Sequence, residues 1–121
     1  MEDRIRFITY QGKKILLTDL SHCSLAEVKR LGELVPKFVT QYPKGSLLLL
    51  ADFTGAEFDR DAITIMKESA VFDRPHIKKS AWIGTESLPH IFYEHLKLFS
   101  QRDLPTFKTR EEALDWLVKE E

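Results

Sequence analysis

The stretch SLLLLADFTG, residues 46–55, decides the fold class of this chain. Its four consecutive leucines place apolar side chains on both faces of an extended segment, which is typical of a central strand buried on both sides. We predict that this strand covers residues 46–53 and that Thr54 and Gly55 turn the chain after it. The segments on either side of this stretch supply the rest of the sheet.

Before this strand, the sequence predicts a hairpin and then a helix. Residues 4–10 alternate between the two faces of a strand, and residues 14–20 form a second strand with an apolar centre. Only three residues separate the two, a connection short enough for an antiparallel hairpin. Ser24 and Glu27 then form a capping box, which begins a helix that should end near residue 41.

After this strand, helices and strands alternate. Asp59 is suited to cap a helix that ends before Arg74, because a residue that precedes a proline avoids the helical region. The remaining predicted elements are a strand over 77–84, a helix over 87–101, a strand at 106–107 and a terminal helix capped by Thr109. Because β-α-β crossovers join parallel strands, the order ββαβαβαβα predicts an α/β fold with a mostly parallel sheet and an antiparallel N-terminal edge strand.

Length and composition favour one ordinary domain over residues 1–121. Apolar residues make up 43% of the chain, and its 18 lysines and arginines nearly balance its 19 aspartates and glutamates. This balance argues against nucleic acid and anionic membranes as partners, because both need a basic excess or patch. The single Cys23 excludes a disulfide framework, and the longest apolar run, 47–51, is far below the ~20 residues of a membrane span. We therefore expect a cytoplasmic protein that is not transmembrane.

Four segments carry a resemblance to a known family: KILLTDL at 14–20, LLADFTGA at 49–56, SAWIG at 80–84 and EEALDWL at 111–117. In their order and spacing the chain resembles the anti-sigma-factor-antagonist (STAS-like, SpoIIAA-like) fold. More closely, it resembles the small bacterial proteins described as STAS/SEC14-like domains. The resemblance implies a single STAS-like domain with a sheet wound by successive β-α turns. It also implies binding of partner proteins, nucleotides or lipids rather than catalysis.

One position departs from the pattern of anti-sigma-factor antagonists. Those proteins carry a phosphorylatable serine after an aspartate, at the start of the helix that follows the central strand. Here Arg60 follows Asp59 at that place. The resemblance therefore does not extend to the phosphorylation switch, and we expect no modification between residues 54 and 64.

Polar residues follow each of the three central strands of the predicted sheet. In open α/β sheets, ligands bind outside the carboxyl ends of the parallel strands, near the amino ends of the following helices. The candidate ligand-binding residues at these ends are Asp19, Ser21, His22, Asp52, Thr54, Gly55, Gly84, Thr85 and Glu86. The same residue types are also those that helix caps and turns require.

Other chemistries find weaker support in the sequence. His22 and Cys23 are adjacent, but sequence neighbours rarely orient as a base and its nucleophile, and a lone cysteine is commonly a packed residue. Glu86, His90 and Glu94 share one helix flank, whereas metal ligands usually converge from more than one element. The chain contains no phosphate loop, dinucleotide motif or nucleophile elbow. We therefore expect no catalytic residues, no metal and no cofactor.

The sequence leaves open whether helices cover one face of the sheet or both. If they covered only one, the other face would carry alternate leucines of the central strand together with Lys78, Ser80 and Trp82. An exposed apolar patch of that size usually marks a partner site. Lys78, Ser80 and Trp82 are therefore a candidate interface for a homo-oligomer or for a protein partner.

Together these observations favour a non-enzymatic binding or regulatory module of the STAS-like type, acting through a protein partner, a second copy of itself or a small ligand. The SEC14-like resemblance supports an alternative, a carrier of a lipid or small apolar ligand. A carrier requires an internal cavity, lined by residues such as Phe38, Met66, Phe92 and Phe99. A small enzyme without a recognisable motif is the third reading.

Overall fold

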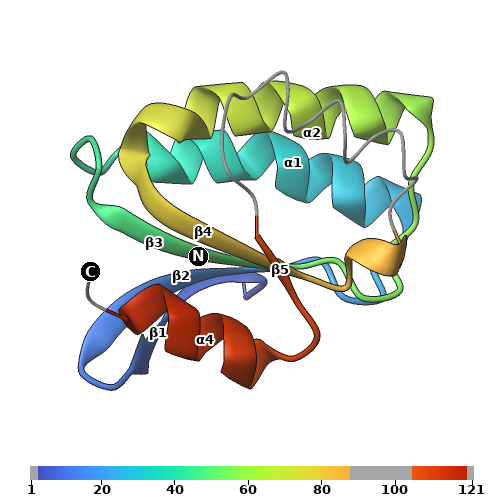
Figure 1. Cartoon of the computed structure of the whole chain (residues 1–121). Helices are drawn as coiled ribbons and strands as arrows, with labels where there is room; N and C mark the ends of the chain where they lie inside the picture. Colours follow the sequence, from blue (N-terminus) through green and yellow to red (C-terminus); the bar gives the residue numbers. More distant parts are fainter. Residues whose placement is uncertain (1–2, 88–104, 120–121) are drawn as a thin grey trace.

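The computed structural model describes residues 3–87 and 105–119 (Figure 1). In chain order its elements are β1 (Ile5–Tyr10), β2 (Lys13–Asp19), α1 (Leu25–Val39), β3 (Leu47–Asp52), α2 (Arg60–Asp73), the 3-10 turn η1 (Arg74–His76), β4 (Ile77–Ile83), the 3-10 turn η2 (Thr85–Ser87), β5 (Thr106–Phe107) and α4 (Arg110–Val118). The helix predicted over 87–101 lies outside the described residues, apart from its first position.

All three described α-helices begin at the predicted caps. The hydroxyl of Ser24 accepts a hydrogen bond from the amide of Glu27 at 3.3 Å. The carboxylate of Asp59 accepts from an amide at the start of α2 at 2.8 Å, and the hydroxyl of Thr109 does the same for α4 at 3.1 Å. These side chains satisfy amides that have no partner within the helix, which fixes where each helix starts.

The five strands form one mixed sheet in the order β1-β2-β3-β4-β5. β1 pairs with β2 in antiparallel fashion, whereas β2, β3, β4 and β5 are parallel to one another. The α/β class, the parallel central strands and the antiparallel N-terminal edge strand are therefore confirmed.

Helices cover both faces of this sheet. α1 and α2 lie side by side on one face, and α4 lies on the other (Figure 1). The leucines of β3 alternate between the two layers: Leu47 and Leu49 pack under α1 and α2, while Leu48 and Leu50 pack against α4. The prediction that this strand is buried on both sides is confirmed.

Of the two arrangements that the sequence left open, the structure has helices on both faces, so Trp82 does not lie on a bare face and the candidate interface that includes it is wrong. Trp82 is 4% exposed and packs in the core under α1 and α2, where its ring centroid lies 4.7 Å from that of Phe53. Ser80 is buried as well, and only Lys78 of the candidate interface is exposed. The physical reason is that α4 covers the face opposite α1 and α2, so neither face of β4 is left uncovered.

The start of β4 contains an irregularity that the sequence pattern did not predict. Leu47 pairs with Ile77, but the next residue of β3, Leu48, pairs with Lys79, so Lys78 is an extra residue in the ladder. Ile77 therefore packs in the core under α1 and α2, whereas Ala81 packs against α4. Strict alternation along the predicted strand over 77–84 would place Ile77 and Ala81 on one face, but the inserted residue reverses the alternation.

None of the helices in the described ranges has the length and apolar character needed to cross a membrane.

Candidate functional site at the strand ends

The loops after β2 and β3 have the same local structure. The carboxylate of Asp19 accepts hydrogen bonds from the amide and hydroxyl of Ser21, at 3.0 and 2.6 Å. The carboxylate of Asp52 accepts from the amide and hydroxyl of Thr54 in the same way, at 3.0 and 2.7 Å. An aspartate whose side chain accepts a hydrogen bond from the amide two residues ahead stabilises a turn. Asp19 and Asp52 therefore end the strands to which they belong.

These two loops lie side by side, because the parallel pairing continues beyond the strands. The amide of Leu20 donates to the carbonyl of Asp52 at 2.8 Å, and the amide of His22 donates to the carbonyl of Thr54 at 2.7 Å. His22 and Gly55 occupy equivalent positions in the two loops, and both have a positive φ, 55° and 68°. The segments 16–23 and 49–56 are thus a short structural repeat.

Glycine is required where the loops pack against each other. A Cβ atom at Gly55 would lie 2.5 Å from Nδ1 of His22, so a larger residue there would displace the histidine ring. A Cβ atom at Gly84, where φ is 70°, would lie only 2.2 Å from the amide nitrogen of Thr54. Gly84 therefore lets the loop after β4 approach the loop after β3 closely.

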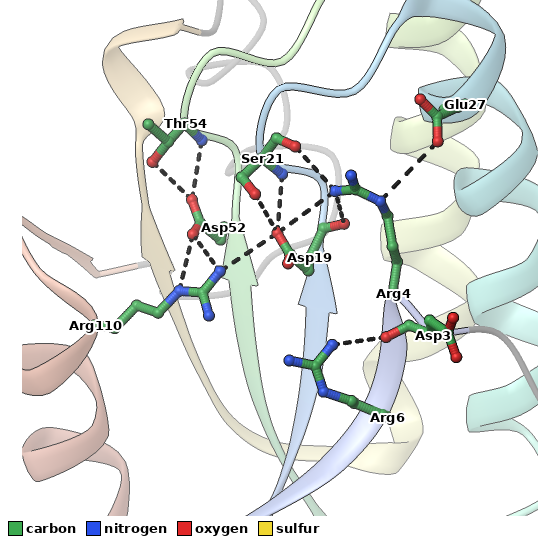
Figure 2. Close-up of polar contacts among 9 residues, drawn as sticks. All are labelled: Asp3, Arg4, Arg6, Asp19, Ser21, Glu27, Asp52, Thr54 and Arg110. Atoms are coloured by element: carbon green, nitrogen blue, oxygen red, sulfur yellow. Dashed lines mark hydrogen bonds and ion pairs between the residues drawn. The ribbon is translucent and has the colours of Figure 1, made fainter.

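An arginine from the other end of the chain joins the two aspartates. Arg110, the first residue of α4, donates to Oδ2 of Asp52 through Nε at 3.0 Å and Nη2 at 2.8 Å, and its Nη2 lies 3.4 Å from Oδ1 of Asp19. Figure 2 shows its guanidinium reaching across from α4 to both carboxylates. This contact therefore holds α4 against the carboxyl ends of β2 and β3.

A second arginine approaches Asp19 from the edge strand. Nη1 of Arg4 lies 3.8 Å from Oδ1 of Asp19 and donates to the carbonyl of Ser21 at 2.9 Å. Its Nε lies 4.0 Å from the carboxylate of Glu27 in α1 (Figure 2). We call Arg4, Asp19, Ser21, Asp52, Thr54 and Arg110 the strand-end cluster.

The charges of the strand-end cluster support one another. Burial alone would raise the pKa of Asp19, because it disfavours the charged carboxylate. The hydrogen bonds from Ser21 and the charges of Arg110 and Arg4 outweigh burial, so the pKa of Asp19 lies below its ordinary value. Burial likewise opposes the charge of Arg110, but the hydrogen bond and charge of Asp52 raise the pKa of Arg110 above its ordinary value. Both groups are held in their charged forms.

The structure brings together part of the predicted site. Asp19, Ser21, Asp52 and Thr54 meet as expected, with His22, Gly55 and Gly84 in the packed backbone beside them. Thr85 and Glu86 continue into η2, and within the described residues no recorded contact joins them to the aspartates. The cluster holds its carboxylates in turns and ion pairs, an arrangement that serves positioning more readily than proton transfer.

Sequence reasoning missed the two arginines of the cluster, although the sequence contains two signals of it. A cation in the first turn of a helix is disfavoured by the helix dipole, so an arginine at the first position of α4 calls for a compensating anion. Arg110 finds two such anions, Asp52 and Asp19, which lie 58 and 91 residues earlier in the sequence. The recurrence of Asp-x-Ser and Asp-x-Thr after two strands was a second signal.

Cys23 lies beside the cluster as a packed residue. Its side chain is buried, and burial is the main cause that raises the pKa of its thiol above the ordinary value. A raised pKa leaves little thiolate at neutral pH, and thiolate is the reactive form. Among residues 3–87 and 105–119, no three His, Cys, Asp or Glu side chains gather as a metal site would require.

Comparison of the chain with protein-family models, with curated proteins and with solved structures finds no match in any of the three.

Proposed function

We propose that the chain is a non-enzymatic binding module of the STAS-like type, which acts through protein contacts made by the outer surface of α1 and α2. The observation that carries this proposal is Phe72, an aromatic side chain that is 61% exposed at the edge of a groove between these helices. The STAS-like assignment itself rests on the sequence resemblance and on the α/β sheet with its parallel central strands.

The α1–α2 groove has a volume of about 560 Å³. In the described part of the chain it is lined by Gly32, Glu33, Pro36, Lys37 and Thr40 of α1 and by Ile65, Glu68, Ser69 and Phe72 of α2. The helices approach closely at its floor, since a Cβ atom on Gly32 would lie 2.8 Å from Cγ2 of Ile65. The groove is thus apolar along its centre and carries charges of both signs at its rim.

Exposure of a phenylalanine at such a groove favours a protein contact. Interfaces are enriched in aromatic residues, which release much apolar surface from water when a partner covers them. Val71, the preceding residue, is also exposed, and these two are the exposed large apolar side chains in residues 3–87 and 105–119. The apolar surface therefore concentrates at the C-terminal end of α2.

The occupant we propose is a second copy of the chain. A two-fold dimer uses the same patch on both subunits, so the patch must fit itself. The α1–α2 groove and Phe72 meet this condition, because the projecting ring and the hollow lie on one surface. Lys37 on one side of the groove and Glu68 on the other add opposite charges that can meet across a two-fold axis.

The strand-end cluster supports the non-enzymatic part of the proposal. Asp19 and Asp52 are engaged by turn hydrogen bonds and by arginines, and the pKa of Asp19 lies below its ordinary value. A general acid or base instead needs a pKa near the working pH. Cys23 is buried and its pKa is raised, which disfavours a nucleophilic role.

The alternative of an apolar-ligand carrier has little support in the described residues. The space under α1 and α2, next to Met66 and Trp82, measures about 40 Å³, which suits a water molecule rather than a lipid chain. Phe38 packs with Phe7 and Tyr42 at the end of the core. Phe92 and Phe99, the other predicted cavity residues, lie outside the described residues.

Sedimentation equilibrium of the wild type and of Phe72→Asp tests the proposal. The wild type should form a dimer at micromolar concentration, and the charge placed at Phe72 should shift it to monomer without loss of helical circular dichroism. Val71→Asp is the matched control, because Val71 is exposed on the same helix but does not line the groove. A wild type that stays monomeric, or equal effects of the two variants, would contradict the proposal.

A further inference from the structure

A pocket rich in lysine lies at the end of the sheet opposite the strand-end cluster. It has a volume of about 740 Å³ and lies where β2, β3 and β4 begin and α4 ends. In the described part of the chain it is lined by Lys13, Lys14, Ser46, Leu48, Lys78, Lys79, Leu117 and Lys119. Five of these residues are lysines, and we call this hollow the lysine pocket.

The irregularity at the start of β4 helps to build the lysine pocket. Consecutive residues of a regular strand point to opposite faces, and an inserted residue changes which side chains share a face. Lys78 is the extra residue in the ladder between β3 and β4, and both Lys78 and Lys79 reach the pocket. Bulges commonly re-aim a side chain next to a functional site.

Two of the lysines are fixed by the C-terminal end of α4. The ammonium of Lys79 donates to the carbonyls of Trp116 and Lys119, at 2.8 and 3.2 Å, and lies 4.3 Å from the centre of the Trp116 ring. The ammonium of Lys13 donates to the carbonyl of Val118 at 3.3 Å. Cations are favoured at this negative end of a helix, which explains how these lysines are held in place.

The other three lysines give the pocket its excess charge. Lys14, Lys78 and Lys119 are exposed, and no aspartate or glutamate of the described residues lines the pocket. The chain as a whole has 18 basic and 19 acidic residues, so its net charge conceals this local excess. A balanced overall charge therefore does not exclude a local site for a small anion on this part of the surface.

We propose that the lysine pocket binds a small molecule that carries two or more phosphate groups. The pocket is concave and its volume lies within the range of about 300 to 1,000 Å³ that small-molecule sites occupy. Lysines from β2, from β4 and from the C-cap of α4 surround it, so several anionic groups of one ligand can each meet an ammonium. Leu48 and Leu117 add apolar surface for the non-phosphate part. This inference is independent of the proposed dimer, which uses the outer surface of α1 and α2 on the other face of the sheet.

Titration calorimetry with inorganic tripolyphosphate at low salt is the direct test. The wild type should bind, and the affinity should fall as salt is added. Lys14→Ala/Lys78→Ala should bind at least tenfold more weakly. Arg60→Ala/Lys108→Ala removes the same charge from exposed basic residues outside the pocket, and it should bind as the wild type does. Unchanged melting curves of both double variants show that the fold is intact.

Three results would overturn the proposal. The first is equal weakening by the two double variants, which would mean that only overall charge matters. The second is the absence of binding at millimolar tripolyphosphate in both the wild type and Glu120→Gln/Glu121→Gln. This double variant removes the two acidic residues that follow Lys119 in the sequence. The third is binding to phosphatidylglycerol vesicles or to single-stranded DNA without binding to tripolyphosphate, which would assign the lysines to a larger anionic surface.

Discussion

Replacing Arg110 with alanine should destabilise the fold, because it removes the contact between α4 and the strand ends. Arg110 donates two hydrogen bonds to Asp52, at 3.0 and 2.8 Å, and lies 3.4 Å from a carboxylate oxygen of Asp19. The side chain of Asp52 is only 6% exposed, so water cannot replace the lost guanidinium fully. The variant keeps a buried carboxylate whose main cation is gone.

The size of the effect follows from burial on the two sides of the pair. A hydrogen bond to a charged group contributes about 1.5 to 3 kcal/mol, and loss of one partner leaves the desolvation cost of the other in place. The Arg110 side chain is 41% exposed, so solvent screens part of the interaction. We therefore expect Arg110→Ala to lower the free energy of unfolding by about 1.5 to 2 kcal/mol.

Urea denaturation followed by circular dichroism measures this loss. Arg60→Ala is the matched control, because Arg60 is the first residue of α2 as Arg110 is of α4, and it is exposed. Removing a cation from the positive end of a helix should be neutral or slightly stabilising there. In a cycle with Asp52→Asn, the two substitutions should be coupled by about 1 kcal/mol or more. An Arg110→Ala variant no less stable than Arg60→Ala would refute the reasoning.

Three further predictions concern the strand-end cluster and its neighbours. The pKa of Asp19 is lower in the folded state than in the unfolded state. The charged carboxylate therefore stabilises the fold above the ordinary carboxyl pKa, and this stabilisation is lost as pH falls through the folded-state pKa. Between pH 7 and pH 3, the urea midpoint should drop further for the wild type than for Asp19→Asn. Gly84→Ala should cost more than Gly45→Ala in thermal melts, since both positions have positive φ but only Gly84 would place a Cβ against backbone, and equal losses would count against this. The thiol of Cys23 should react slowly with Ellman's reagent in the native protein and at once in urea, and fast native labelling would show that it is accessible.

The elements of this fold could be predicted because local patterns determine them. The four leucines of β3 and the three helix caps act over a few residues. The strand and the three helices lie where these patterns predict them. The parallel order followed from crossover handedness, which is also a general rule. The ends of parallel strands likewise brought Asp19 and Asp52 together as expected.

The features that were not predicted depend on distant parts of the chain. The burial of Trp82 depends on α4 covering the far face, and no property of β4 alone indicates which face a terminal helix will take. Arg110 reaches Asp52 across 58 residues. The lysine pocket combines residues from distant parts of the chain, on three strands and a helix. The net charge of −1 for the whole chain does not reveal this local excess of lysine.

An isotope-filtered NOE experiment tests the proposed dimer most directly. It uses a mixed sample in which half of the chains carry ¹³C and ¹⁵N, so that only contacts between copies are detected. The account predicts contacts from the Phe72 ring of one copy to the Ile65 methyl groups of the other, because Ile65 lines the α1–α2 groove. Contacts between copies that arise only from other surfaces, or none at concentrations where the chain is dimeric, would contradict it.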